Sequence, residues 1–340
     1  MHMAIFIFLA LALSGPAPWW QIQSGGLDTN LRGVSVSQTS HGKYVVWASG
    51  TNGTVLRSLD EGKSWGKFKV DGGANLDFRD VEGFGPDTAY VMSSGDGEKS
   101  RIYKTTDGGK SWTLQYTDKR AGFFLDSLAC YSETDCFALS DPVDGKFLVL
   151  ATRDGQHWSD LPRDKMPAAL PAEFGWAASG TSIALCDNKD IYFGTGGPAT
   201  RVFRSGDRGR SWTAVETPIA SGNPSSGIFS LACHGRSIIA VGGDYRKPVG
   251  GNSVASYSRD SGATWHLAEQ QPGGYRSGVV FLSGDDVATI GPNGTEVSHD
   301  GGVHWIPMEK LNLNAASFAA TQGWAVGPLG TIARFIPHLP

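Results

Sequence analysis

The sequence predicts an all-β fold, a seven-bladed β-propeller, and three observations carry this prediction. A pattern of the form Ser/Thr-x-Asp-x-Gly-x-x-Trp occurs in six copies, with tryptophans at positions 65, 112, 158, 212, 265 and 305. These tryptophans are 47, 46, 54, 53 and 40 residues apart, which is the period of a four-stranded propeller blade. Short β-branched and aromatic runs alternate with Gly-rich turns, and helical periodicity is missing almost everywhere.

Each copy of the pattern closes one blade, which accounts for six blades. Residues 315–335 supply three more strands without a copy, so they form the core of a seventh blade. The missing fourth strand is predicted to be the N-terminal segment 19–23. This segment begins with tryptophan, as does the outer strand that ends each copy of the pattern elsewhere. Such pairing of the two termini locks the ring and removes exposed sheet edges.

The pattern itself is best explained as a structural fastener of a hairpin. Its carboxylate can accept bonds from nearby backbone N–H groups, its glycine permits a positive φ, and its tryptophan can pack between blades. The third copy has lost one residue between Asp154 and Trp158, which a fastener tolerates and a catalytic motif does not. The six carboxylates given this structural role are Asp60, Asp107, Asp154, Asp207, Asp260 and Asp300.

The repeated pattern is identified as the Asp-box, or bacterial neuraminidase repeat. It is shared by sialidases, xyloglucan-cleaving hydrolases, sortilin-type receptors and the photosystem II stability/assembly factors. The blade text Leu31–Val34 followed by Trp47–Arg57 and the box resembles the last family most closely, and this resemblance covers almost all of the mature chain. The resemblance implies a propeller with an arginine-rich patch that docks a partner chain; it does not by itself assign a photosynthetic role.

The N-terminal text predicts export. Residues 4–14 are an apolar run too short to span a membrane comfortably, and residues 15–18 supply the small and helix-breaking residues found near cleavage sites. We therefore expect a signal peptide over residues 1–18 and a single propeller domain over residues 19–340, secreted or periplasmic, monomeric, and without stable membrane insertion. Because Met1–Met3 lacks a Lys or Arg, an uncleaved anchor is the alternative.

Four cysteines agree with an oxidising compartment. A bridge between Cys130 and Cys136 across one hairpin is the favoured pairing, and a bridge between Cys186 and Cys233 links equivalent positions of neighbouring blades. Buried free thiols are the alternative. No cofactor is expected and no metal site, because no zinc-like spacing of His and Cys occurs. A formal charge of −4 argues against nucleic acid as the principal partner.

Function is expected on the face opposite the Asp-boxes, where the unusual loops gather. Arginines recur at the start of three inner strands, at Arg32, Arg79 and Arg276, and blade three has Asp126 there instead. Such a basic patch suits a carboxylate or phosphate, although each arginine can instead pair with a nearby acid. The remaining ligand-binding candidates, all from loops of this face, are Arg101, Ser226, Asp244 and Arg246.

Two functions follow from these residues. The first, favoured here, is a binding or assembly-type protein that recognises a polar or anionic ligand, either a carbohydrate or a protein chain. The second is an exo-acting glycoside hydrolase, sialidase-like or another Asp-box glycosidase, which needs paired carboxylates or a tyrosine assisted by a glutamate. Its candidate catalytic residues are Glu173, Asp141, Asp80, Tyr245 and Tyr275.

Overall fold

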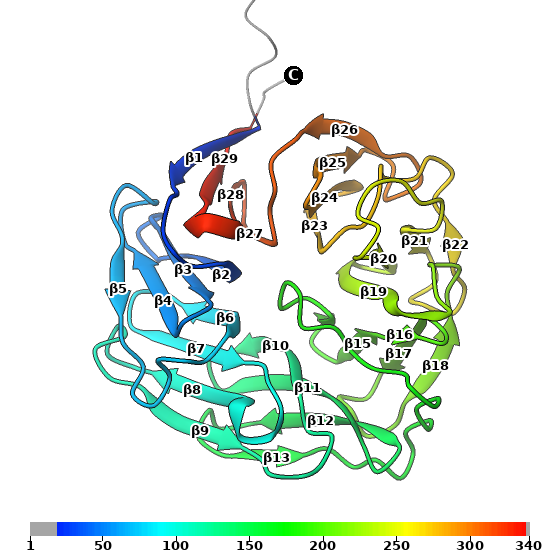
Figure 1. Ribbon diagram of the computed structural model, residues 1–340, viewed down its shortest axis with the longest axis horizontal. Helices are drawn as coiled ribbons and strands as arrows, with labels where there is room; N and C mark the ends of the chain where they lie inside the picture. The colour runs from blue at the N-terminus through cyan, green and yellow to red at the C-terminus, as the bar shows by residue number, and fades with distance from the viewer. Residues whose placement is uncertain (1–18, 338–340) are drawn as a thin grey trace, which may run out of the picture.

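The computed structural model describes residues 19–337, in which seven antiparallel sheets are arranged in a ring (Figure 1). The predicted all-β, seven-bladed propeller is therefore confirmed. The predicted signal peptide, residues 1–18, lies outside the described residues and stays a prediction.

The first four blades follow one another along the chain. Blade one consists of β2 (Leu31–Gln38), β3 (Tyr44–Gly50), β4 (Thr54–Ser58) and β5 (Gly66–Phe68). Blade two consists of β6 (Phe78–Phe84), β7 (Thr88–Ser93), β8 (Arg101–Thr105) and β9 (Thr113–Thr117), with a 3-10 turn η1 (Gly97–Lys99) before β8. Blade three consists of β10 (Leu125–Ser132), β11 (Asp135–Val143), β12 (Lys146–Thr152) and β13 (Trp158–Asp160). Blade four consists of β14 (Ile183–Cys186), β15 (Asp190–Gly194), β17 (Arg201–Ser205) and β18 (Thr213–Glu216).

The last three blades complete the ring. Blade five consists of β19 (Asn223–His234), β20 (Ser237–Asp244), β21 (Ala255–Ser258) and β22 (His266–Leu267), and the short β16 (Gly196–Gly197) joins its inner edge. Blade six consists of β23 (Gly278–Ser283), β24 (Asp286–Gly291), β25 (Gly294–Ser298) and β26 (Ile306–Glu309). Blade seven consists of β27 (Ala315–Ala319), β28 (Gln322–Val326), η2 (Pro328–Gly330), β29 (Ile332–Phe335) and β1 (Trp20–Ser24).

The ring is closed by its first strand, as the sequence predicts. β1 pairs with β29, so the outermost strand of blade seven comes from the N-terminal end of the domain. Trp20 donates its indole N–H to the Thr295 hydroxyl of blade six at 2.8 Å, and Gln23 donates to the Glu61 carbonyl of blade one at 2.8 Å. The strand therefore ties blade seven to both of its neighbours.

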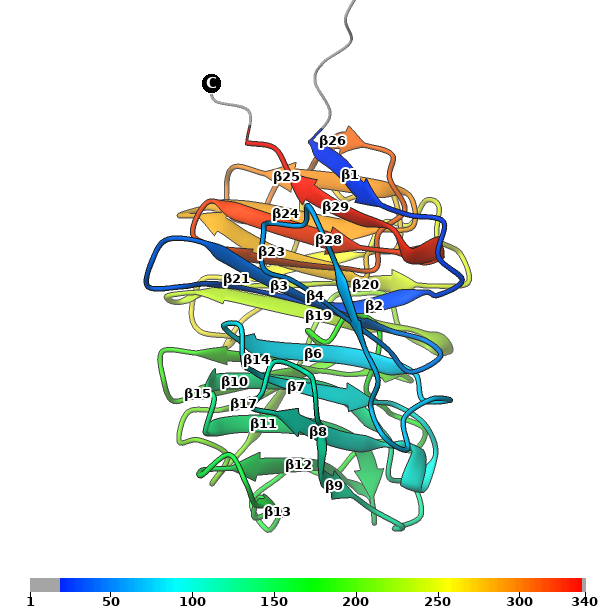
Figure 2. The ribbon, with the colours of Figure 1, turned by 90° about the vertical axis from the view of Figure 1, so that its left-hand side faces the viewer.

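Hydroxyls on the inner strands hold neighbouring blades together. Ser35 accepts from the Gly83 N–H at 3.0 Å, Ser127 from Ile183 at 2.9 Å, and Ser230 from Val279 at 3.0 Å. Apolar side chains fill the space between the sheets, which stack closely around the ring (Figure 2). These contacts satisfy buried N–H groups at the inner edge of each blade.

In each Asp-box the carboxylate holds a hairpin between the third and fourth strands of a blade. Asp60, for example, accepts from the Ser64 N–H at 2.8 Å and from the Ser64 hydroxyl at 2.6 Å, while the Ser58 hydroxyl accepts from the Gly62 N–H at 2.7 Å. These bonds lower the pKa of Asp60 to about 2. The carboxylate is therefore fully used by its own turn.

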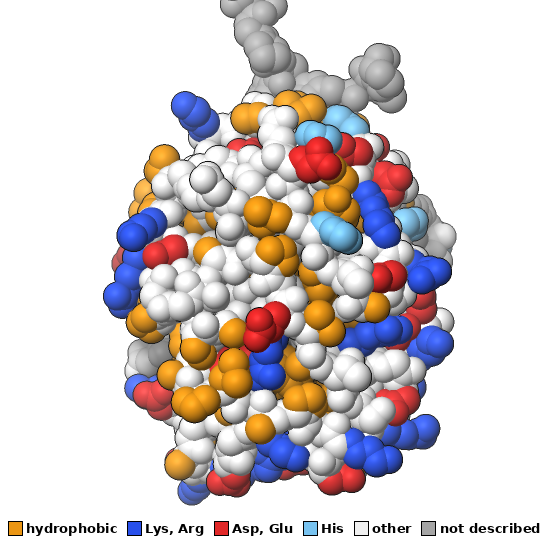
Figure 3. Space-filling model, turned by 90° about the vertical axis from the view of Figure 1, so that its right-hand side faces the viewer, with side chains coloured by type: hydrophobic (Ala, Val, Ile, Leu, Met, Phe, Trp, Pro, Cys, Tyr) orange, Lys and Arg blue, Asp and Glu red, His pale blue; other side chains and the backbone are white. Residues whose placement is uncertain are grey.

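Two disulfides join the four cysteines. Cys130 is bridged to Cys136 within blade three, and Cys186 to Cys233 between blades four and five. Both predicted pairings are present, and they indicate an oxidising compartment. Within residues 19–337, no helix is long and apolar enough to cross a membrane. On the side of the ring that bears β18 and β22, charges of both signs are interspersed with hydrophobic side chains (Figure 3).

Candidate binding site

A cavity of about 520 Å³ lies near the middle of the ring, on the face opposite the Asp-boxes. Its walls come from the starts of inner strands and from connections between second and third strands, the loops that the sequence places on this face. We call it the arginine pocket and define it by six of its lining residues: Arg32, Arg79, Trp176, Phe229, Tyr245 and Tyr275.

Two of the three predicted arginines meet in this pocket. Arg79 donates from Nε to Asp77 at 2.7 Å and from Nη1 to the Ala177 carbonyl at 2.8 Å. Arg32 faces the same Asp77 oxygen at 3.9 Å from Nη2. Two guanidinium groups thus share one carboxylate, which leaves one net positive charge in the pocket from these three side chains.

Arg32 is held with part of its hydrogen-bonding capacity unused. Among residues 19–337, its buried Nε has no hydrogen-bond partner, and neither does the buried indole N–H of Trp176 in the same pocket. Burial, with the nearby charge of Arg79, lowers the pKa of Arg32, and Asp77 only partly opposes this. An anion placed here would gain a charge-assisted bond to a guanidinium that burial has already partly desolvated.

Aromatic rings form one wall of the pocket. Trp176 stacks on Phe229 with ring centroids 4.1 Å apart, and Tyr245 meets Trp176 edge-on at 5.5 Å. Tyr275 packs against Phe229 at 4.7 Å, and burial raises its pKa above the usual value. Tyr245 is 40% exposed, so its ring reaches the mouth of the pocket. The pocket therefore pairs a cationic floor with a flat apolar wall.

The segment between β13 and β14 reaches the middle of the ring (Figure 1), where its Ala177 carbonyl accepts a hydrogen bond from Arg79. We call its central part, residues 175–181, the strap. Gly175 donates its N–H to Asp141 at 2.8 Å, and Thr181 Oγ1 lies 2.6 Å from the Ser230 hydroxyl of blade five. A side chain at Gly175 would place its Cβ 2.3 Å from Asp126 Oδ2, so only glycine fits this close approach.

The strap covers buried acids. Asp126 is 1% exposed, and burial together with the charge of Asp141 raises its pKa well above the usual value. Burial raises the pKa of Asp141 to about 7 and that of Asp80 to about 8. Asp80, a candidate acid on sequence grounds, accepts N–H bonds from Val81 at 2.8 Å and Leu128 at 2.7 Å. It joins blades two and three, in the manner of the inner-strand serines.

Arg276 does not join the other two arginines, contrary to expectation. It is 1% exposed and donates to Glu296 at 2.7 Å. Its neighbours Tyr275 and Ser277 both line the pocket, and successive side chains of an extended segment point to opposite sides, so Arg276 points away. The alternative in which an arginine pairs with a nearby acid applies to this residue.

Glu173 is engaged elsewhere. It forms a two-pronged ion pair with Arg201 and accepts from the Thr195 hydroxyl at 2.6 Å and the Leu170 N–H at 2.8 Å. Within the described residues, no tyrosine–glutamate pair of the sialidase kind is therefore assembled in the arginine pocket. Glu173 instead anchors the long loop that leads into the strap.

The other predicted ligand-binding residues lie around the pocket or away from it. Arg246 stacks over the Tyr245 ring at 5.8 Å, and Asp244 accepts from the Arg246 N–H at 3.0 Å. Ser226 is buried and accepts from Asn223 at 2.8 Å. Arg101 is bonded to the Glu98 carbonyl at 2.5 Å and to the Tyr103 hydroxyl at 3.0 Å, outside the pocket.

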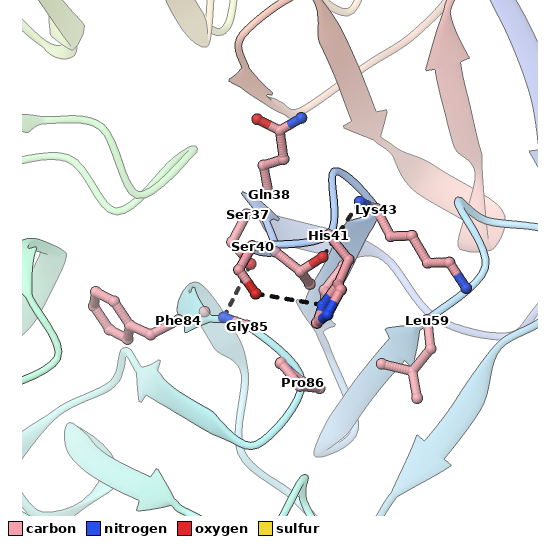
Figure 4. Close-up of a pocket in the computed structure, with 12 residues that line it drawn as sticks. Ser37, Gln38, Ser40, His41, Lys43, Leu59, Phe84, Gly85 and Pro86 are labelled. Atoms are coloured by element: carbon pink, nitrogen blue, oxygen red, sulfur yellow. Dashed lines mark hydrogen bonds between the residues drawn. The ribbon is translucent and has the colours of Figure 1, made fainter.

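A larger cavity, of about 840 Å³, lies between blades one and two on the Asp-box side (Figure 4). Polar atoms of its lining hydrogen-bond to one another: Gly85 donates its N–H to the Ser37 hydroxyl at 3.0 Å, and Lys43 donates its N–H to the Thr39 hydroxyl at 3.2 Å. It holds no buried charge without a partner among its described residues. Its chemistry is therefore less specific than that of the arginine pocket, despite its size.

The comparisons with known proteins agree with the family resemblance found in the repeated blade sequences. The chain is 24% identical over 242 residues to "Photosystem II assembly protein Ycf48" of Synechococcus sp. (strain JA-2-3B'a(2-13)), a match that covers 70% of this chain and 63% of that one. A solved structure, "YCF48 bound to D1 peptide", superimposes with a TM-score of 0.69 at 15% identity, over 95% of this chain and 98% of that one. The chain resembles the photosystem II assembly proteins.

A second relative has a different activity. The chain is 24% identical over 246 residues to "Xyloglucanase" of Hypocrea jecorina, across 69% of this chain but only 27% of that enzyme. It thus spans about a quarter of the xyloglucanase and less than two thirds of the assembly protein. No family model matches the chain.

Of the four rings of the aromatic wall, the sequence singled out Tyr245 and Tyr275 as candidate site residues, and both line the pocket. It did not single out Trp176 or Phe229, which lies inside a buried strand. One signal could have found Trp176: six of the 11 tryptophans belong to Asp-boxes, whereas Trp176 stands outside any box beside a glycine that only a close contact explains. The glycine-rich connection of blade four makes room for Trp176, since a Cβ at Gly196 would lie 2.4 Å from its Nε1.

Proposed function

We propose that the protein is an exported, assembly-type binding protein whose arginine pocket takes an anionic group from a partner protein chain. The observation that carries this proposal is that Arg32 and Arg79, which share the single carboxylate of Asp77, line one cavity together with an aromatic wall. A carboxylate is the anion that suits a guanidinium best in a protein ligand.

Two similarities support this proposal. The relative of known sequence is named an assembly protein, and the solved relative holds a peptide. Neither assigns a partner to this chain, and the proposal includes no photosynthetic role. On the side of the ring seen in Figure 3, charges of both signs are interspersed, whereas the arginine pocket has two guanidinium groups with one carboxylate.

The proposal is tested with short synthetic peptides that carry one glutamate, and with matched peptides in which glutamine replaces it. We expect the glutamate peptides to bind the wild-type protein more tightly, with affinity that falls as salt is added. Arg32→Gln should remove most of the preference for glutamate because it removes the guanidinium with free capacity. Arg101→Gln, outside the pocket, is the control. Equal binding of both peptides to the wild-type protein would refute the proposal.

A second candidate function is glycoside hydrolysis, favoured by one observation. Asp126 and Asp141 both lie against Gly175, and their carboxylates interact electrostatically. Burial raises the pKa of each carboxyl group, as a general acid requires. The xyloglucanase relative also supports it. The test is a screen with xyloglucan and sialosides; turnover that disappears in Asp141→Asn would establish this activity in place of simple binding.

A further inference from the structure

The turn between β28 and β29 contains a leucine in a backbone conformation that leucine disfavours. Leu329 has φ 55° and ψ 33°, in the left-handed region. The corresponding turn of blade one has Asn52 there, with φ 58°. Asparagine and glycine tolerate this region, whereas larger side chains are strained in it. The blade-seven turn therefore keeps a shape that asparagine would adopt more easily.

The strain at Leu329 is not offset by burial of its side chain. Leu329 is 72% exposed, and Leu27 beside it is 44% exposed. The two are linked through the backbone, since Leu27 donates its N–H to the Leu329 carbonyl at 3.1 Å, and Gly330 donates to the Thr29 carbonyl at 2.8 Å. The turn thus holds two leucines close together through the backbone, with Leu27 packed against Gly330 and the Leu329 side chain largely in solvent. Strained residues of this kind cluster at functional sites.

These leucines lie directly beside the arginine pocket. Pro328, which precedes Leu329, lines the pocket. Gly327 accepts the Leu31 N–H at 3.2 Å, and Arg32 is the next residue along that strand. A chain whose carboxylate reaches Arg32 can therefore continue over Pro328 toward the two leucines.

We propose that Leu329 and Leu27 form a hydrophobic contact that selects partner segments with a large aliphatic residue next to the bound acid. This inference rests on the proposed function, because it assumes that a protein chain supplies the anion. Charge and apolar surface are adjacent here, so the complementary partner segment carries an acidic and an aliphatic residue close together.

The test uses a pair of fluorescently labelled synthetic peptides that differ at one position, with leucine or serine two residues from a glutamate. The wild-type protein should bind the leucine peptide about tenfold more tightly, as expected for partial burial of one aliphatic side chain. In Leu329→Asn both peptides should bind with the weaker affinity. Leu114→Asn, which changes an exposed leucine on the outer strand β9, should leave the tenfold preference unchanged.

The Leu329→Asn variant also separates binding from folding. Asparagine suits the left-handed turn, so its Tm should equal or exceed that of the wild-type protein, and a loss of preference then reflects a lost contact. Leu27→Ser provides a second variant with the same expected effect on the preference. Equal affinity of both peptides for the wild-type protein overturns the inference, although the proposed function stands if both still require Arg32. If neither peptide binds, the proposed function fails as well.

The same variants test whether a second copy of this chain, rather than a partner segment, contacts Leu329 and Leu27. If the leucines join two copies of this chain, sedimentation should show a concentration-dependent dimer that Leu329→Asn abolishes. That result, with no leucine preference in the peptide assay, would replace a partner segment with a second copy and overturn the inference.

Discussion

At the scale of single residues, a shift of one residue along the inner strand decides whether an arginine faces the pocket or is buried away from it. Arg32 and Arg79 face a cavity, while Arg276 is buried against Glu296. Aligned by their text, the three are equivalent, but blade six has an extra residue between its arginine and the glycine of the strand. Two of the three arginines predicted from the sequence therefore lie in the pocket, and the sequence alone could not show that the third points the other way.

Glu173 provides a residue-scale prediction. Its carboxylate is buried and holds Arg201 with both oxygens, so Glu173→Gln leaves a guanidinium without its counter-charge. Breaking a buried pair in this way costs roughly 3 kcal/mol, so we expect a clear fall in the free energy of unfolding. Urea denaturation measures this. Glu98→Gln, which affects an exposed ion pair with Lys119, is the control and should change little. An unchanged midpoint in Glu173→Gln would contradict the structural role.

At the scale of elements, the repeated hairpins made blade number and strand order predictable. Each Asp-box satisfies its own turn locally, so its sequence pattern carries its structure. The strap was not predictable in the same way, because its position depends on partners from blades two, three and five that are distant in sequence. Its glycine at position 175 has meaning only beside Asp126.

The closing strand gives an element-scale prediction. Deleting residues 19–24 removes β1, exposes the edge of β29 and leaves the Thr295 and Glu61 contacts unmade. We expect Tm to fall by more than 10 °C, since a whole strand and a buried tryptophan are lost. Deleting residues 338–340, which lie outside the described part, is the matched control and should change Tm little. Equal melting temperatures for the two deletions would refute closure by the N-terminal strand.

At the scale of the whole molecule, the ring is held by contacts between neighbouring blades and by two covalent links of different reach. The Cys130–Cys136 bridge spans 6 residues inside blade three, whereas Cys186–Cys233 spans 47 residues between blades four and five. The N-terminal apolar run and the cysteine number predict an exported chain. The propeller register favoured the cysteine pairing that the structure has but could not exclude free thiols. The ligand could not be predicted from these features, because many propellers share one fold and differ only in their loops.

The two disulfides should differ in their effect on stability. Loop-closure entropy grows with the length of the closed loop, so the 47-residue link restricts the unfolded chain by about 2 kcal/mol more than the 6-residue link. We expect the double variant Cys186→Ala/Cys233→Ala to lose more free energy of unfolding than Cys130→Ala/Cys136→Ala. Chemical denaturation under non-reducing conditions compares them. A larger loss in the blade-three variant would show that local packing, rather than the covalent link between blades, dominates.

The buried acids beneath the strap predict how the whole molecule responds to pH. Burial raises the pKa of Asp141 from 3.8 to about 7 and that of Asp80 from 3.8 to about 8, so the folded state favours their protonated forms. Their contribution to stability is therefore complete below about pH 4 and is lost as pH rises through 7 and 8. Asp-box acids act in the opposite direction: hydrogen bonds lower the pKa of Asp60 to about 2, so their contribution is lost only in strong acid.

Asp141→Asn isolates one of these groups. Asparagine can still accept the Gly175 N–H but carries no charge at any pH, so the variant should lose less stability than the wild-type protein between pH 5 and pH 8. Thermal unfolding at both pH values measures the difference. Asp144→Asn, an exposed acid in the same turn, should keep the wild-type pH dependence. If Asp141→Asn and the wild-type protein show the same change in Tm between these pH values, Asp141 is not protonated beneath the strap, and the general-acid role of the second candidate function loses its support as well.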